Sequence, residues 1–136
     1  MQIRRTVIVA ASMAVLGPAA VVFLAPVARA QAHLLVSRVA VAAKPATYTG
    51  PCPTTVEFSA TVFASKIPLE IDYRWERSDG GIGVKQHIAM EDHTLVVTDT
   101  WNLGKRGDRV AAWEKLHVLT PNEMSSPPGH VVLACQ

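Results

Sequence analysis

From Leu34 onward, hydrophobic and polar residues alternate with a period of two, which is the pattern of β-strands that bury one face. The alternation is strictest over residues 69–76, where four apolar residues are interleaved with four charged ones, so we expect the apolar set in a core and the charged set in water. A second clear strand covers residues 56–62. The side chains expected in the core are Leu69, Ile71, Tyr73 and Trp75 in the first of these strands and Val56, Phe58, Ala60 and Val62 in the second.

Weaker versions of the same pattern predict further strands, separated by turns rich in glycine, proline or polar residues. These strands cover residues 39–44, 84–90, 95–101, 110–119 and 131–135. The one at 84–90 is expected at a sheet edge with Val84, Ile88 and Met90 facing inward, whereas Trp113 falls out of phase and would need a bulge to face inward. Seven or eight short strands without a helical period indicate an all-β, two-sheet antiparallel sandwich.

The first thirty residues follow a different pattern, with a basic start, a long apolar run and a small-residue end. Two arginines precede an apolar stretch over residues 6–27, and Ala28-Arg29-Ala30 is the kind of sequence that signal peptidase reads. We expect residues 1–30 to be a cleaved signal peptide. Residues 31–136 would then form one secreted or periplasmic domain without stable membrane insertion.

Loss of the signal peptide would change the charge balance. The chain has 13 Lys and Arg residues, 11 Asp and Glu residues and a net charge of +2, and the signal peptide carries Arg4, Arg5 and Arg29 but no acidic residue. The mature domain would therefore carry ten basic residues against eleven acidic ones, a net charge of −1. A domain with this balance lacks the excess of positive charge that is typical of nucleic-acid-binding proteins.

Cys52 and Cys135 are the only cysteines, and an even count in an exported protein predicts a disulfide. Closing a loop of about 80 residues would remove about 4.5 kcal/mol of unfolded-state entropy in the chain-entropy model. A redox or metal role would need another cysteine or a histidine at short spacing, and neither is present. We expect the bridge to lie at one pole of the sandwich.

One set of residues, spread over the whole mature chain, resembles the pattern of a known type of domain. It consists of Tyr48-Thr49-Gly50-Pro51-Cys52-Pro53, Phe58, Tyr73-Arg74-Trp75, Arg77-Ser78-Asp79-Gly80, Trp101, Trp113, Leu116 and Cys135. With these residues the chain resembles an immunoglobulin-like or fibronectin type III-like domain of a secreted bacterial protein. The resemblance implies a β-sandwich with Trp75 in its core, and it implies no activity. The position of the disulfide departs from the antibody type, so antibody-like binding loops are not expected.

The ionisable residues form no catalytic or metal-binding motif that we can assemble from the sequence. His87 and His93 straddle a turn and would need Asp92 or Glu91 as a third ligand, so ordinary surface histidines are the preferred interpretation. No serine lies in a nucleophile-elbow setting. We therefore expect neither an enzyme nor a bound metal or cofactor.

Two tryptophans and one loop are the candidate binding residues. Trp101 and Trp113 are expected in the core, but either would form a binding patch if it were exposed beside Val96 or Val110. The loop contains Arg106, Gly107 and Asp108, the tripeptide that integrins bind when it is exposed. The same three residue types are also common in loops without any binding role.

These observations favour an exported binding module for an unidentified protein or cell-envelope polymer. The alternative is a small secreted enzyme inhibitor, in which residues 121–129 would form a rigid inserting loop. An exposed tryptophan patch or sheet edge would favour the module, and a protruding loop would favour the inhibitor.

Overall fold

The computed structural model describes residues 34–136, which contain nine β-strands. The strands are β1 (Val36–Lys44), β2 (Thr47–Gly50), β3 (Thr54–Ala64), β4 (Leu69–Arg77), β5 (Gln86–Met90), β6 (Thr94–Leu103), β7 (Arg109–Thr120), β8 (Met124–Ser125) and β9 (Gly129–Cys135). Within this range no helix has the length and apolar character needed to cross a membrane. The expected signal peptide lies outside the described residues, so its cleavage stays a prediction.

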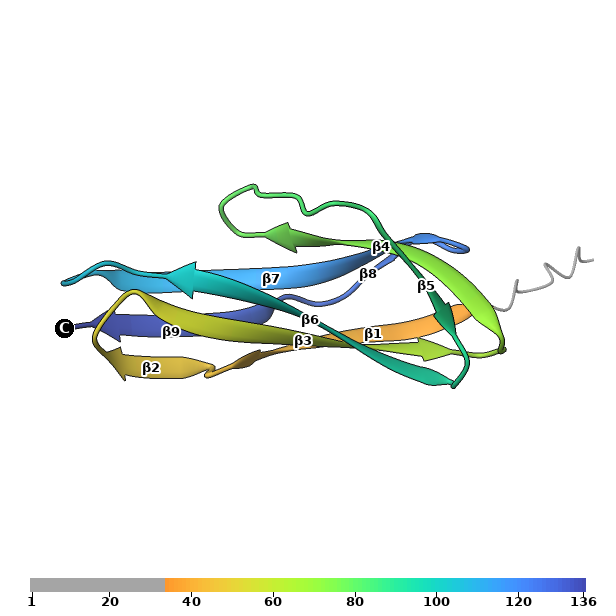
Figure 1. Ribbon diagram of the computed structural model, residues 1–136, viewed down its shortest axis with the longest axis horizontal. Coiled ribbons are helices and arrows are strands. Elements are labelled where there is room, and N and C mark those ends of the chain that lie inside the picture. The colour runs from red at the N-terminus through yellow and green to blue at the C-terminus, as the bar shows by residue number, and fades with distance from the viewer. Residues whose placement is uncertain (1–33) are drawn as a thin grey trace, which may run out of the picture. The chain divides into compact units, whose positions relative to one another are not determined.

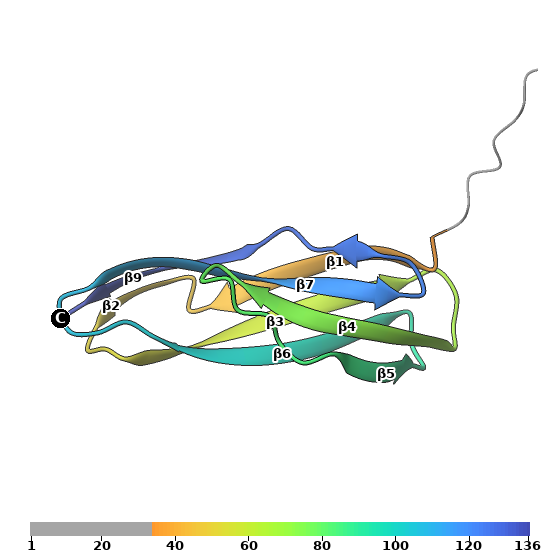
Figure 2. The ribbon, with the colours of Figure 1, turned by 90° about the horizontal axis from the view of Figure 1, so that it is seen from above.

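The strands form two facing sheets, which appear as two layers in Figures 1 and 2. Sheet A has the order β1-β3-β6, and sheet B has the order β2-β9-β7-β4-β5 with β8 pairing with β7. Most neighbours are antiparallel, but β2 pairs with β9 in parallel. The sequence pattern missed β2, because the chain leaves sheet A after Lys44 and reaches sheet B within a few residues. The expected antiparallel sandwich is confirmed, with this one parallel strand as the exception.

The core lies between the two sheets and is made by the residues that the alternation selected. The predicted inward residues of β3 are all buried, and β4 buries its predicted residues except Leu69, which is half-buried. On β7 and β9, alternate residues complete the core from the other side. The residues that these two strands bury are Ala112, Glu114, Leu116, Val118, Val131, Leu133 and Cys135, with Gly129 at the start of β9.

The outward face of β4 is less exposed than its charges suggested. Of its predicted water-facing residues, only Glu70 is exposed, and the other three are half-buried. Glu76 explains the difference, because its carboxylate accepts bonds from Arg74 at 3.1 Å and from His117 at 2.8 Å, and Lys115 lies 3.2 Å away. The charged side chains of this face therefore pair with one another, and this pairing shields them in part from solvent.

Two further expectations for individual residues were wrong. Val84 is 81% exposed and does not face the core, because β5 begins only at Gln86. Trp113, expected in the core, is out of phase as the pattern indicated and points to the outer face of sheet B without a bulge, while Glu114 takes the inward position. The edge position predicted for the strand around residues 86–90 is confirmed, since β5 ends the order of sheet B.

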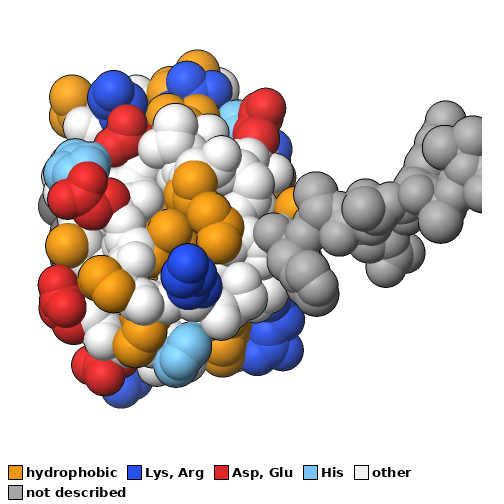
Figure 3. All heavy atoms as spheres, turned by 90° about the vertical axis from the view of Figure 1, so that its right-hand side faces the viewer, with side chains coloured by type: hydrophobic (Ala, Val, Ile, Leu, Met, Phe, Trp, Pro, Cys, Tyr) orange, Lys and Arg blue, Asp and Glu red, His pale blue; other side chains and the backbone are white. Residues whose placement is uncertain are grey.

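A disulfide joins Cys52 and Cys135, which are 83 residues apart in sequence. It lies at the pole where β9 ends, marked C in Figure 1. Gly104 packs against it with a φ of 86°, and a Cβ there would lie 2.5 Å from the Cys135 sulfur. At the opposite pole, where β3 ends and β6 begins, apolar side chains gather in the middle with charged ones around them (Figure 3).

Replacing both cysteines by serine should lower the free energy of unfolding by about 2 to 4 kcal/mol, because the bridge restrains nearly the whole domain in its unfolded state. Urea melts of the double variant and of the oxidised protein would measure the difference. Reduced wild-type protein is the control and should match the double variant. A loss of less than about 1 kcal/mol would show that the bridge adds little to stability.

Candidate functional site

Arg77, the last residue of β4, ties the two sheets together through its guanidinium group. Its Nε donates to Glu114 Oε1 at 2.8 Å, and its Nη2 donates to Asp99 Oδ2 at 2.9 Å. Nη2 also lies 3.3 Å from the carbonyl oxygen of Thr100, and the guanidinium carbon lies 4.9 Å from the ring centre of Trp101. Because Glu114 belongs to sheet B and Asp99 to sheet A, one side chain spans the sandwich.

Glu114 is the most unusual residue of this group, because its carboxyl group is 0% exposed. Its Oε2 has no hydrogen-bond partner among the described residues. Burial raises the pKa of Glu114 from 4.5 to about 7; the Asp99 carboxylate adds to this rise, and the Arg77 guanidinium opposes it. A buried carboxyl with a strongly raised pKa beside a cleft is a recognised sign of a functional site, although structural ion pairs produce it too.

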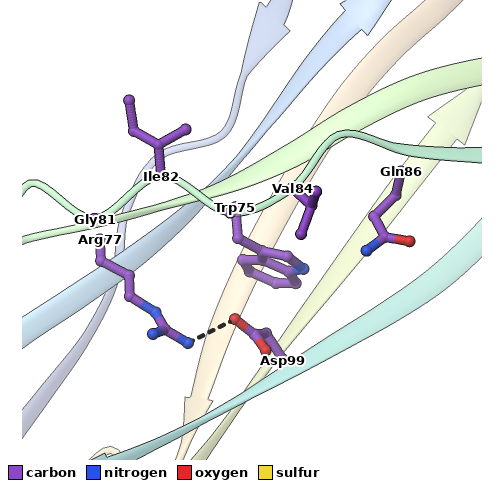
Figure 4. Close-up of a pocket in the computed structure, with 8 residues that line it drawn as sticks. Trp75, Arg77, Gly81, Ile82, Val84, Gln86 and Asp99 are labelled. Carbon is purple, nitrogen blue, oxygen red and sulfur yellow. Dashed lines mark hydrogen bonds and ion pairs between the residues drawn. The ribbon is translucent and has the colours of Figure 1, made fainter.

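A pocket of about 310 Å³ opens directly beside Arg77. Its walls come from β4, from β6 and from the segment at residues 81–86. Two backbone bonds hold this segment against β4: Gly83 N–H donates to the Trp75 carbonyl at 2.8 Å, and Arg77 N–H donates to the Gly81 carbonyl at 2.9 Å. Figure 4 shows Trp75, Val84 and Gln86 around the pocket, with Asp99 opposite them and Ile82 pointing away.

A second pocket of about 210 Å³ adjoins the first and shares Arg77, Gly81 and Ile82 with it. It reaches the outer face of sheet B, where Trp113 and Lys115 line it. The Lys115 ammonium lies 5.8 Å from the centre of a Trp113 ring. We call the region of both pockets the Arg77 surface, which comprises Trp75, Arg77, Ile82, Val84, Asp99 and Trp113.

The structure brings both predicted tryptophans to Arg77, though neither is fully buried. Trp101 is half-buried against the core beneath the guanidinium, and Trp113 is half-buried on the outer face. Val96 and Val110, the neighbours that the sequence suggested for them, line neither pocket. A role of Trp101 and Trp113 in binding stays a prediction.

The loop that carries Arg106, Gly107 and Asp108 lies elsewhere, beside the disulfide. Cys135 N–H donates to the Asp108 carbonyl at 2.9 Å, and the Asp108 carboxylate accepts the Lys105 N–H at 3.0 Å. The tripeptide is exposed, but its aspartate is already engaged in the turn.

The two histidines considered for metal binding have different partners. His87 Nδ1 lies 2.6 Å from an Asp72 oxygen across the β4–β5 pair, whereas His93 Nδ1 lies 2.8 Å from the Ala64 carbonyl. Within residues 34–136, no three His, Cys, Asp or Glu side chains come together in a way that could hold a metal ion.

Sequence reasoning missed the central pair of the site, Arg77 and Glu114. The strict alternation ends at residue 76, just before Arg77, and Glu114 is in none of the candidate groups. A signal was present, because Glu114 has the same period-two phase as the apolar residues Leu116 and Val118, which the structure buries. A charged residue in an inward phase requires a partner, and that requirement points to a cation on a neighbouring strand.

No protein-family model matches the sequence, and no curated protein is significantly similar to it. Among solved structures, the chain is similar to the CARDB domain of a protein from Pyrococcus furiosus, which was crystallised in complex with di-metal ions. The TM-score is 0.53 and the sequence identity is 13%, and the match covers 77% of this chain and 100% of that one. At this identity the likeness concerns the fold alone. The chain is an immunoglobulin-like β-sandwich, as the sequence led us to expect.

Proposed function

We propose that this chain is an exported binding module that holds a protein or cell-envelope polymer at the Arg77 surface, and that it acts by binding and not by catalysis. The observation that carries the proposal is the exposure of two large apolar side chains, Ile82 at 63% and Val84 at 81%, on a segment that borders both pockets. The fold does not bury them, although it buries most of its other large apolar side chains. Apolar side chains beside tryptophan and arginine are the composition of binding hot spots.

The segment at residues 81–86 is also held by several hydrogen bonds, although it is a surface connection. Besides its two bonds to β4, its Gly81 N–H donates to the Asp79 carboxylate at 2.8 Å. A ligand that binds there would order little additional chain, which lowers the entropic cost of association. Export is supported by the disulfide, since such bonds persist in oxidising compartments.

The inhibitor alternative has less support, because hydrogen bonds hold residues 121–129 against β7 and against the start of β1. Within this segment, β8 pairs with β7, and Ser126 exchanges two hydrogen bonds with Leu116 at 2.9 and 3.0 Å. The Asn122 side chain accepts a hydrogen bond from the Val36 N–H and donates one to the Val36 carbonyl.

Binding of the exported protein to the producing organism's envelope tests the proposal. We expect saturable binding to one of two fractions, purified cell wall or envelope protein. Val84→Asp should weaken it at least about tenfold, because a charge would replace an apolar contact. Val132→Asp is the matched control, since Val132 is 55% exposed on β9 and lies outside both pockets.

Equal binding by wild type, Val84→Asp and Val132→Asp would contradict the assignment of the surface. Absence of saturable binding to both fractions would contradict the proposed function itself. Circular dichroism should show the same fold for all three proteins, because both substituted side chains are exposed.

A further inference from the structure

Strand β6 is a long free edge of sheet A. It ends the order β1-β3-β6, and its ten residues pair with β3 on one side without any register shift. The other edge of sheet A is covered: Asn122 bonds the backbone of Val36, and Gly129 approaches Val41 so closely that a Cβ would lie 2.7 Å away. No described strand covers β6 in the same way. Edges of this kind are templates for pairing with another strand.

The free backbone groups of β6 can be located. Thr100 has both of its groups engaged by side chains, because its N–H donates to Asp99 Oδ1 at 2.9 Å and its carbonyl accepts from Arg77. Its backbone therefore faces away from β3. Backbone direction alternates along an antiparallel pair, so Thr94, Val96 and Thr98 also face away. The His93 carbonyl agrees with this alternation. His93 is one residue before Thr94, and its carbonyl points toward β3, where it accepts a hydrogen bond from the Ala64 N–H.

The open part of the edge is short and symmetric. The turn at residues 91–93 limits it at one end and the engaged Thr100 limits it at the other, which leaves residues 94–98 with Val96 in the middle. The exposed residues read Thr, Val, Thr in either direction, and no charge interrupts them. Val96 is 60% exposed. The inward residues on either side of Val96 are Leu95 and Val97, both aliphatic.

We propose that two copies of this chain pair through β6 in antiparallel fashion, with the twofold axis at Val96. Thr94 of each copy then lies opposite Thr98 of the other, and the two Val96 side chains meet. Three facing residue pairs exchange about six N–H···O bonds and extend sheet A across both copies. A twofold pairing that uses all of the open edge has this register and no other. The paired segment, residues 94–98, contains no residue of the Arg77 surface, so each copy in the dimer keeps its own.

A second copy fits this edge better than a foreign strand does. The segment is complementary to itself in its exposed side chains, whereas no charge or pocket along it would select another sequence. An interface of five residues per strand is small, so the dimer should form at high protein concentration and dissociate on dilution.

Sedimentation velocity of the oxidised exported protein, from low micromolar to near-millimolar concentration, tests the proposal. We expect a reversible monomer–dimer equilibrium. Val96→Lys should raise the dissociation constant at least about tenfold, because two like charges would meet at the axis. Val96→Glu should do the same, and an equimolar mixture of the two variants should form a heterodimer.

Val132→Lys is the matched control and should dimerise like the wild type, because it removes a similarly exposed valine outside sheet A. A monomer at every concentration would overturn the proposal. Equal weakening by Val132→Lys and Val96→Lys, or a mixture of the Val96 variants that stays monomeric, would overturn it as well.

Discussion

Replacing Arg77 by methionine should lower the free energy of unfolding by about 3 kcal/mol at about pH 8 and by clearly less at about pH 5. Glu114 is fully buried, and Arg77 is its hydrogen-bonding partner. At the higher pH the variant must either bury the Glu114 carboxylate without its partner or protonate it against the solvent, and both cost free energy. At the lower pH the carboxyl is protonated, since its pKa is about 7, and the loss of the guanidinium matters less. Denaturant melts at both pH values measure the two losses.

A second substitution separates the charge effect from the loss of packing. Arg77→Met combined with Glu114→Leu removes both members of the pair and leaves side chains of similar size in the core. The double variant should recover most of the stability lost by the single variant at about pH 8. A double variant less stable than the single one, or a single variant with the same loss at both pH values, would show that the buried charge is not the cause.

The pH dependence of stability should follow two carboxyl groups with opposite shifts. Because the pKa of Glu114 rises from 4.5 to about 7 on folding, the folded protein binds more protons than the unfolded protein in this window. The free energy of unfolding should therefore fall by about 3 kcal/mol as the pH rises from 4.5 to 7. Burial alone would raise the pKa of Glu76, but bonds with His117, Lys115 and Arg74 hold it at about 2. Stability that depends on Glu76 should be lost as the pH falls below 4.5.

The domain should therefore be most stable near pH 4.5. In Glu114→Gln the decline between pH 4.5 and 7 should disappear, because the amide does not titrate. Glu57→Gln is the control, since Glu57 is exposed on β3, and it should keep the wild-type decline. Chemical denaturation across this pH range measures the three curves. An unchanged decline in Glu114→Gln would mean that another group causes it.

The sandwich was predictable because most of its strands bury one face. On β3 and β4 every second residue is apolar, so the inward residues followed directly from the period. Strand β2 was not predictable in this way, since four residues that join the other sheet in parallel carry too little alternation to recognise. Val84 was misplaced because it precedes β5, which begins only at Gln86, and local sequence does not specify where a strand begins to pair.

The site was harder to predict than the fold, because it depends on which strands become neighbours. Arg77, Asp99 and Glu114 lie on three strands, and only the strand order of both sheets places them together. The tryptophans were recognised as candidates by residue type alone, and their place beside Arg77 came from the structure. Glu114 could have been singled out by its inward phase, but its partner could not.

Hydrogen–deuterium exchange of the exported protein, with and without the envelope fraction that binds it, tests most directly whether the Arg77 surface is where this domain acts. Self-association through β6 would be present in both samples and would cancel in the comparison. The proposed function predicts slower exchange on binding at residues 80–86 and 99–101, and no change at residues 104–108 beside the disulfide. Protection confined to residues 104–108, or to the outer face of sheet A, would contradict it.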